Sequence, residues 1–196
     1  MPTGVPIKDV EVQLFEAAER ILLTGGPNAL TSRAVTDEAG VAKGVLHRHF
    51  ADFDGFLAAF TLDRIARLDD QASALRAAAG TGTVTGNLAR ALTDVFGSVG
   101  LALMGLVMSR DELRTRLRAA GAGRVPVARQ ATAMIAAYLE AERDLGRVRS
   151  GADIEAVALT LIGTAHLLFA GRDGAGPASS EVLRAVITVM AGALTN

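Results

Sequence analysis

Residues 31–50 carry the most informative local pattern of this 196-residue chain and read TSRAVTDEAGVAKGVLHRHF. Thr31 or Ser32 can cap a first short helix, because a side-chain hydroxyl accepts a hydrogen bond from a free N–H at a helix start. Gly40 suits the left-handed backbone of a tight turn. A second short helix is expected from about Lys43 to His49. Together these features predict two short helices that pack across each other, as in a helix-turn-helix.

The apolar positions of the stretch support this interpretation. If Ser32 is position one and the first helix ends at Ala39, Gly40 falls at position nine, in the turn between the helices. The positions expected to be buried are Val35, Ala39, Val41 and Leu46. The second helix would then present Lys43, Val45, His47 and Arg48 to a major groove. The alternative is an ordinary helical hairpin with a glycine turn.

Outside this stretch, apolar residues recur at helical spacing almost everywhere. A first helix is expected to end at the Thr-Gly-Gly-Pro run of residues 24–27, and a longer one is opened by Asp52 and runs to Gly80. One apolar stripe continues over 88–106, three more cover 131–142, 154–169 and 182–193, and breaks fall at 121–126 and 171–177. No segment shows sustained two-residue alternation, so we predict an all-α protein of about nine helices.

Composition excludes several classes of function. The chain has no cysteine and three histidines, only 4% of its residues are aromatic, and its net charge is −1. Thiolate chemistry is therefore excluded, and bulk attraction to nucleic acid is not expected. We find no nucleophile–base pair, glycine-rich phosphate loop or metal-ligand spacing, so we expect neither an enzyme nor a cofactor or metal. The N-terminus has no signal-peptide pattern, and the uncharged runs fall short of about 20 apolar residues, so we expect a cytoplasmic protein without a membrane span.

The segment from about Val10 to Phe60 resembles the DNA-binding domain of TetR-type (tetracycline-repressor-like) transcriptional regulators. The resemblance rests on the first-helix stripe, the Ala39-Gly40-Val41 turn, the Lys43-Gly44 pair and the ending of residues 46–50. It implies a homodimer whose N-terminal domains bind a palindromic DNA operator and whose C-terminal domains dimerise and bind a small molecule. We accordingly expect a helix-turn-helix domain over residues 1–52 and a ligand-binding and dimerisation domain over 53–196.

The resemblance also indicates which residues contact DNA. These are Thr31, Ser32, Arg33, Ala42, Lys43, Gly44, Val45, His47 and Arg48. Three positions depart from the family: His47 stands where a tyrosine is usual, Phe53 where a lysine is frequent, and Thr36 where a small alanine is usual. Residues 1–60 hold five basic residues against eight acidic ones, a net charge of −3. Because phosphate contacts supply the sequence-independent part of DNA affinity, we expect weak non-specific binding that is strongly sensitive to salt.

The central helices hold candidates for a ligand cavity. Methionine and aromatic side chains suit permissive apolar pockets, and the predicted ligand contacts are Phe96, Met104, Met108, Met134, Tyr138 and His166. Plain core packing is the alternative for each, and for His166 a core or interface histidine. The arginines of residues 110–129 form either a solvated face or an anion site. The effector is expected to be largely apolar.

The last two helices carry a second face of small residues, which are Ala152, Ala156, Thr160, Gly163 and Leu167. Two such helices from each subunit would form a four-helix bundle, which predicts a homodimer. The sequence therefore favours a ligand-responsive transcriptional regulator, most simply a repressor that a small molecule releases from its operator. The alternatives are an activating or constitutive regulator, or a helical small-molecule-binding or interaction protein whose DNA-binding surface has weakened.

Overall fold

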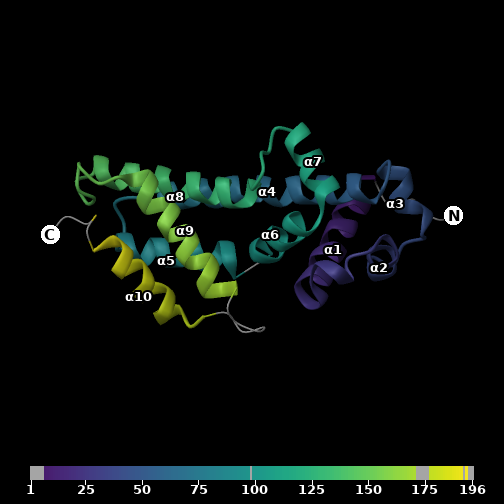
Figure 1. The fold of residues 1–196 in the computed structure, drawn as a ribbon, viewed down its shortest axis with the longest axis horizontal. Coiled ribbons are helices and arrows are strands. Elements are labelled where there is room, and N and C mark those ends of the chain that lie inside the picture. The colour runs from purple at the N-terminus through teal and green to yellow at the C-terminus, as the bar shows by residue number, and fades with distance from the viewer. Residues whose placement is uncertain (1–6, 98, 171–176, 192, 194–196) are drawn as a thin grey trace. The chain divides into compact units, whose positions relative to one another are not determined.

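The computed structural model describes residues 7–97, 99–170, 177–191 and 193, and its regular structure is helical (Figure 1). The described part contains ten helices: α1 (Ile7–Ala29), α2 (Ser32–Glu38), α3 (Gly44–His49), α4 (Phe53–Ala77), α5 (Val84–Phe96), α6 (Gly100–Ser109), α7 (Asp111–Ala119), α8 (Pro126–Asp144), α9 (Ile154–Ala170) and α10 (Ser179–Met190). The all-α prediction is confirmed. The break expected at 171–177 lies outside the described residues except for Pro177.

The regular part of helix α1 ends at Gly26, within the run where the sequence predicted the helix end. Gly26 leaves helical geometry with φ 70° and ψ −177°, and Pro27 follows it before a last short turn to Ala29. Upstream of this kink, the inner face of the helix is buried through Leu14 and Leu22. The chain therefore changes direction at residue 26, before α2 begins.

Contacts divide the chain into two compact units. The first contains residues 1–64 and 102–125, and its core gathers aromatic rings: the centroid of Phe15 lies 5.7 Å from that of Phe56 and 5.9 Å from that of Phe60. The second contains residues 65–101 and 126–196. In it α9 packs against α8 and α10, and α10 packs along α5 (Figure 1). The predicted boundary of the DNA-binding domain at residue 52 stays a prediction.

The apolar stripe at 88–106 extends over two helices with a break between them. Helix α5 ends at Phe96 and α6 begins at Gly100. A β-carbon on Gly100 would lie 2.2 Å from the backbone oxygen of Val95. Because a backbone oxygen cannot rotate aside, this close approach requires glycine. The apolar spacing continues across the corner, which is why the pattern alone did not reveal it.

The described residues include strongly apolar helices such as α6 and α9. No single one of them is both long and apolar enough to cross a bilayer. Only the bent pair of α5 and α6, counted together, reaches that length and composition.

Candidate nucleic-acid interface and ligand pockets

The turn between α2 and α3 has the geometry expected of a helix-turn-helix. Thr31 caps α2, since its hydroxyl oxygen accepts a hydrogen bond of 3.1 Å from the N–H of Ala34. Gly40 adopts φ 67° in the turn, and the N–H of Val41 donates to the carbonyl of Thr36 at 3.0 Å. Of the four positions predicted to be buried, Val35 and Leu46 are fully buried, whereas Ala39 and Val41 are half-buried.

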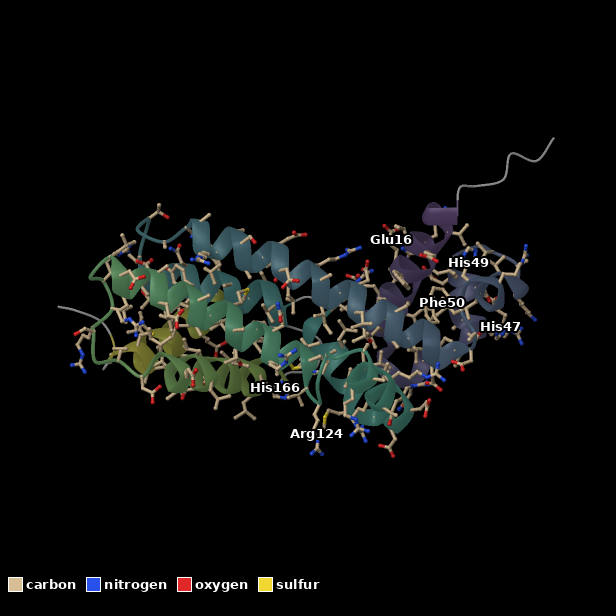
Figure 2. The ribbon with its side chains drawn as sticks, turned by 90° about the horizontal axis from the view of Figure 1, so that it is seen from above. Glu16, His47, His49, Phe50, Arg124 and His166 are labelled. Atoms are coloured by element: carbon tan, nitrogen blue, oxygen red, sulfur yellow. The ribbon has the colours of Figure 1, made fainter. Side chains whose placement is uncertain are left out.

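Helix α3 presents cations on one side and packs with the other. Lys43, His47 and Arg48 are exposed, and in the part of the chain that the structure describes neither Lys43 nor Arg48 pairs with an acid. On the inner side, His49 places its Nδ1 atom 3.6 Å from Glu11 Oε1, and the Phe50 ring lies 6.0 Å from that of Phe15. In Figure 2, His49 and Phe50 lie toward α1, whereas His47 lies at the outer edge of these helices.

The predicted DNA contacts all lie in α2, in α3 or in the residues that flank them. Most are exposed; Ser32 and Val45 are half-buried. Arg33 is exposed, and its Nε lies 3.5 Å from a carboxylate oxygen of Asp37. Exposed pairs of this kind contribute little to stability, so Arg33 can exchange this partner for a phosphate. The role of all these predicted contacts in binding DNA stays a prediction.

Many acids of this unit are paired, which the sequence did not reveal. Arg20 lies 2.7 Å from Glu38 and Arg64 lies 2.6 Å from Glu19. At the start of α4, Asp54 pairs with Arg110 and Asp52 pairs with Arg116. Both arginines belong to the stretch that the sequence predicted to be either a solvated face or an anion site. Because these arginines already pair with carboxylates, their contacts favour the solvated-face interpretation. The partners of these last two pairs lie more than fifty residues apart in the sequence, so no local spacing signals them.

In the second unit, Tyr138 belongs to a buried polar network. Its hydroxyl donates to Glu142 Oε1 at 2.5 Å and accepts from Asn87 Nδ2 at 2.9 Å. The other oxygen of Glu142 lies 3.2 Å from Arg147 Nη1. Burial and the bond to Glu142 raise the pKa of Tyr138 well above its ordinary value. A ligand that contacts this hydroxyl must replace one of its two bonds.

The other predicted ligand contacts are dispersed. Phe96 is buried, and its ring lies 6.2 Å from that of His166 in an edge contact. Met104 is half-buried and Met108 is exposed, and both belong to the first unit, whereas Met134 is buried in the second. A single cavity that joins all six residues stays a prediction.

A pocket of about 320 Å³ does exist within the second unit. Side chains from α4, α5 and α8 line it, including the apolar Leu75 and Met134. Gln71 also lines it, and its Oε1 atom is buried with no hydrogen-bond partner among the described residues. Asn87 links the pocket to Tyr138. The sequence did not single out Gln71 or Asn87, because a polar residue on an amphipathic helix resembles any solvated one.

Most of the small-residue face that the sequence predicted lies on α9, although Ala152 precedes this helix. Thr160 and Gly163 are exposed on it, and Leu159 and Leu167 expose 64% and 74% of their surfaces. Positions three and four apart share one side of a helix, so these residues form a continuous stripe. On α10, Ile187 is 48% exposed. Such apolar exposure is typical of an interaction surface.

Comparison with known proteins identifies the N-terminal segment. Residues 14–60 match the family model described as bacterial regulatory proteins, tetR family, which confirms the resemblance drawn from the sequence. Among curated proteins the comparison finds no significant match.

Solved structures with the same fold cover almost the whole chain. The reduced form of NemR from E. coli has a TM-score of 0.72 at 17% identity, and covers 95% of this chain and 98% of its own. A TetR-family transcriptional regulator from Agrobacterium tumefaciens has a TM-score of 0.72 at 13% identity, with 96% and 99% covered. A protein of Saccharomonospora viridis in complex with choline has a TM-score of 0.68 at 15% identity, with 96% and 100% covered. The chain thus has the fold of TetR-family regulators.

Proposed function

We propose that this chain, which carries the DNA-binding domain of the tetR family of bacterial regulatory proteins, is a homodimeric repressor that a small molecule releases from a palindromic operator. The observation that carries the proposal is the positive charge exposed on the outer side of α3. This side exposes two cations, Lys43 and Arg48, that no acid of the described residues neutralises. A helix with free cations, supported across a glycine turn by α2, suits a major groove.

The exposed face of α9 supports the proposed dimer. Leu159 and Leu167 would be covered by the same face of a second copy, together with Ile187 of α10. A two-fold dimer contacts a palindrome with two identical recognition helices about 34 Å apart. Two exposed apolar helices from each subunit are enough for a four-helix interface.

The pocket of about 320 Å³ supports a response to a small molecule. Its lining combines apolar side chains such as Leu75 and Met134 with the charged Arg90 and Asp94, which suits a largely apolar effector that also carries a polar group. The unpartnered Oε1 atom of Gln71 calls for one hydrogen-bond donor on that effector. The choline-bound structure from Saccharomonospora viridis shows that this fold accommodates a small ligand in at least one protein. We infer that the effector binds between α4, α5 and α8.

Release then follows from linkage. An effector that prefers the conformation with the wrong spacing between recognition helices lowers the affinity for DNA. By thermodynamic necessity, operator DNA lowers the affinity for the effector by the same factor. An effector whose affinity is unchanged by saturating operator DNA would contradict this mechanism.

The experiment that tests the proposed function is a binding titration with DNA fragments that flank the protein's own gene. Fluorescence anisotropy is recorded between about 50 and 200 mM KCl, with excess unlabelled competitor DNA. We expect retention of one fragment that contains a palindrome. A fragment of equal length in which one half of that palindrome is scrambled serves as the matched control.

The two outcomes separate the proposed function from its alternative. Specific binding that the scrambled fragment loses supports the repressor and provides the assay for an effector search. If no fragment binds specifically even at low salt, the DNA-binding surface has weakened. The chain is then better described as a helical small-molecule-binding or interaction protein.

A further inference from the structure

The first turn of α4 places negative charge close to the recognition helix. Asp52 and Asp54 follow His49, the last residue of α3, by three and five positions. Three peptide steps span at most about 11 Å, which is close to the Debye length of about 8 Å at physiological salt. Unpaired, these carboxylates would repel the same phosphates that the cations of α3 attract.

Arg116 of α7 covers the first of these carboxylates. Its Nη2 atom donates to Asp52 Oδ2 at 2.8 Å, and its Nε donates to Glu112 Oε1 at 3.0 Å, which holds the guanidinium between two acids. The other oxygen of Asp52 accepts the N–H of Gly55 at 2.7 Å and so caps α4. This backbone hydrogen bond, with help from Arg116, lowers the pKa of Asp52, and Asp52 in turn raises the pKa of Arg116.

Arg110, which directly precedes α7, covers the second carboxylate. Its Nη1 lies 3.5 Å from Asp54 Oδ1, and its Nη2 donates to the carbonyl of Leu30 at 3.3 Å. Its guanidinium carbon also lies 5.6 Å from the centre of the Phe53 ring, within the range of a cation–π contact. Leu30 immediately precedes the cap of α2, so Arg110 connects the start of the helix-turn-helix with the start of α4.

The charge of the whole unit agrees with these contacts. Residues 1–60 have a net charge of −3. The segment 102–125, which folds into the same unit, holds five arginines against two acids, a net charge of +3. Helix α7 and the residues beside it therefore supply the positive charge that the helix-turn-helix segment lacks.

From these contacts we propose that Arg110 and Arg116 are positioning residues for DNA binding that act by neutralising Asp52 and Asp54. They raise DNA affinity without touching DNA, because they reduce the negative charge beside the cations of α3 that face the phosphates. The inference rests on the proposed function, since it explains how the outer side of α3 keeps its affinity for DNA.

The test compares Arg116→Gln, Asp52→Asn and the double variant in the full-length protein. Binding to a short labelled DNA duplex of random sequence is measured by anisotropy from about 50 to 200 mM KCl. We expect Arg116→Gln to weaken binding about two- to fivefold at low salt, with the loss shrinking as salt screens the carboxylate. Asp52→Asn should bind at least as tightly as the wild type, since asparagine also caps helices.

The double variant distinguishes charge from structure. If Arg116 acts by neutralising Asp52, adding Asp52→Asn restores most of the affinity that Arg116→Gln loses. Arg118→Gln is the matched control, because Arg118 lies on the same helix and its side chain bonds only to Thr115 among the described residues. It should change affinity less, and Asp52→Asn should not couple with it.

Three results would overturn the inference. The first is a loss in Arg116→Gln that persists in the double variant, because a structural role would leave it there. The second is an equal loss in Arg118→Gln. The third is unchanged binding by Arg116→Gln while the wild type binds DNA, which removes this inference and leaves the proposed function intact. A wild type that binds neither this duplex nor any palindrome-bearing fragment contradicts the proposed function itself. Thermal unfolding of each variant shows that it is folded.

Discussion

At the scale of single residues, the buried Tyr138 shows that a hydrogen-bond partner can come from a distant part of the chain. The sequence indicates that Tyr138 needs a hydrogen-bond partner if buried, but not which one. The structure supplies Glu142, one helical turn away, and Asn87, fifty-one residues away. The first partner could be inferred from helical spacing. The second depends on how α5 packs against α8, which no local pattern contains.

Tyr138 should resist ionisation until the protein unfolds. Its pKa is raised in the folded state, so the unfolded chain releases this proton first, near pH 10. Stability is therefore complete below that pH and falls as the pH rises further. The chain has one tyrosine and no tryptophan, so the ultraviolet absorbance of tyrosinate reports this residue alone. We expect that signal to rise together with the loss of circular dichroism.

Ionisation of Tyr138 at pH 10 in a chain that keeps its full helical signal would contradict the buried network. Tyr138→Phe is the control for the stability measurement. It removes the titrating group, so the alkaline loss of stability above pH 10 should become smaller.

Leu46 should be the residue of α3 that matters most for folding. It is fully buried between the helices of the helix-turn-helix, whereas its neighbour Val45 is half-buried. Truncating a buried leucine removes contacts and leaves a cavity, so Leu46→Ala should cost about 2–5 kcal/mol of unfolding free energy. Urea unfolding followed by circular dichroism measures it. Val45→Ala should cost clearly less, and equal losses would mean that the packing of α3 differs.

At the scale of elements, local signals predicted the helix-turn-helix because its determinants are close in sequence. The cap at Thr31 and the left-handed turn at Gly40 act within a few residues, and the structure has both. The corner between α5 and α6 was missed because apolar periodicity reports which side of a helix is buried, not whether the helix continues. The sequence shows the cluster of arginines around α7 but not their partners at the start of α4, which lie about sixty residues away.

The exposed cations of α3 should bind DNA without supporting the fold. Lys43→Ala and Arg48→Ala should each weaken DNA binding and reduce the slope of log affinity against log salt by about 1. Their melting temperatures should stay near that of the wild type, because both side chains are exposed. Arg76→Ala is the control, since Arg76 is exposed in the last turn of α4, in the other unit. Unchanged affinity in both α3 variants would show that another surface contacts DNA.

At the scale of the whole molecule, the net charge of −1 conceals an uneven distribution. The N-terminal sixty residues are acidic, and a segment that folds into the same unit supplies compensating arginines. Composition could not predict this compensation, because each unit is built from two segments that are far apart in the sequence. For the same reason, the six candidate ligand residues, adjacent in the expected order of helices, divide between two units.

The exposed stripe of α9 should hold the dimer together. Glutamate at Leu167 would place a charge in a face that a second copy covers, so Leu167→Glu should shift the protein toward monomer in light scattering. Binding to a palindrome should fall with it, because one recognition helix then acts alone. Leu145→Glu is the control, since Leu145 is 57% exposed but lies outside α9. A Leu167→Glu protein that remains dimeric would place the interface elsewhere.

The close approach at the corner of α5 and α6 limits how this gene can drift. Any missense change in the codon for Gly100 adds at least a β-carbon, and that atom would lie 2.2 Å from the oxygen of Val95. Exposed positions of the helices on either side can change with little cost. In descendant lineages we expect Gly100 to be retained even where the operator and the effector change.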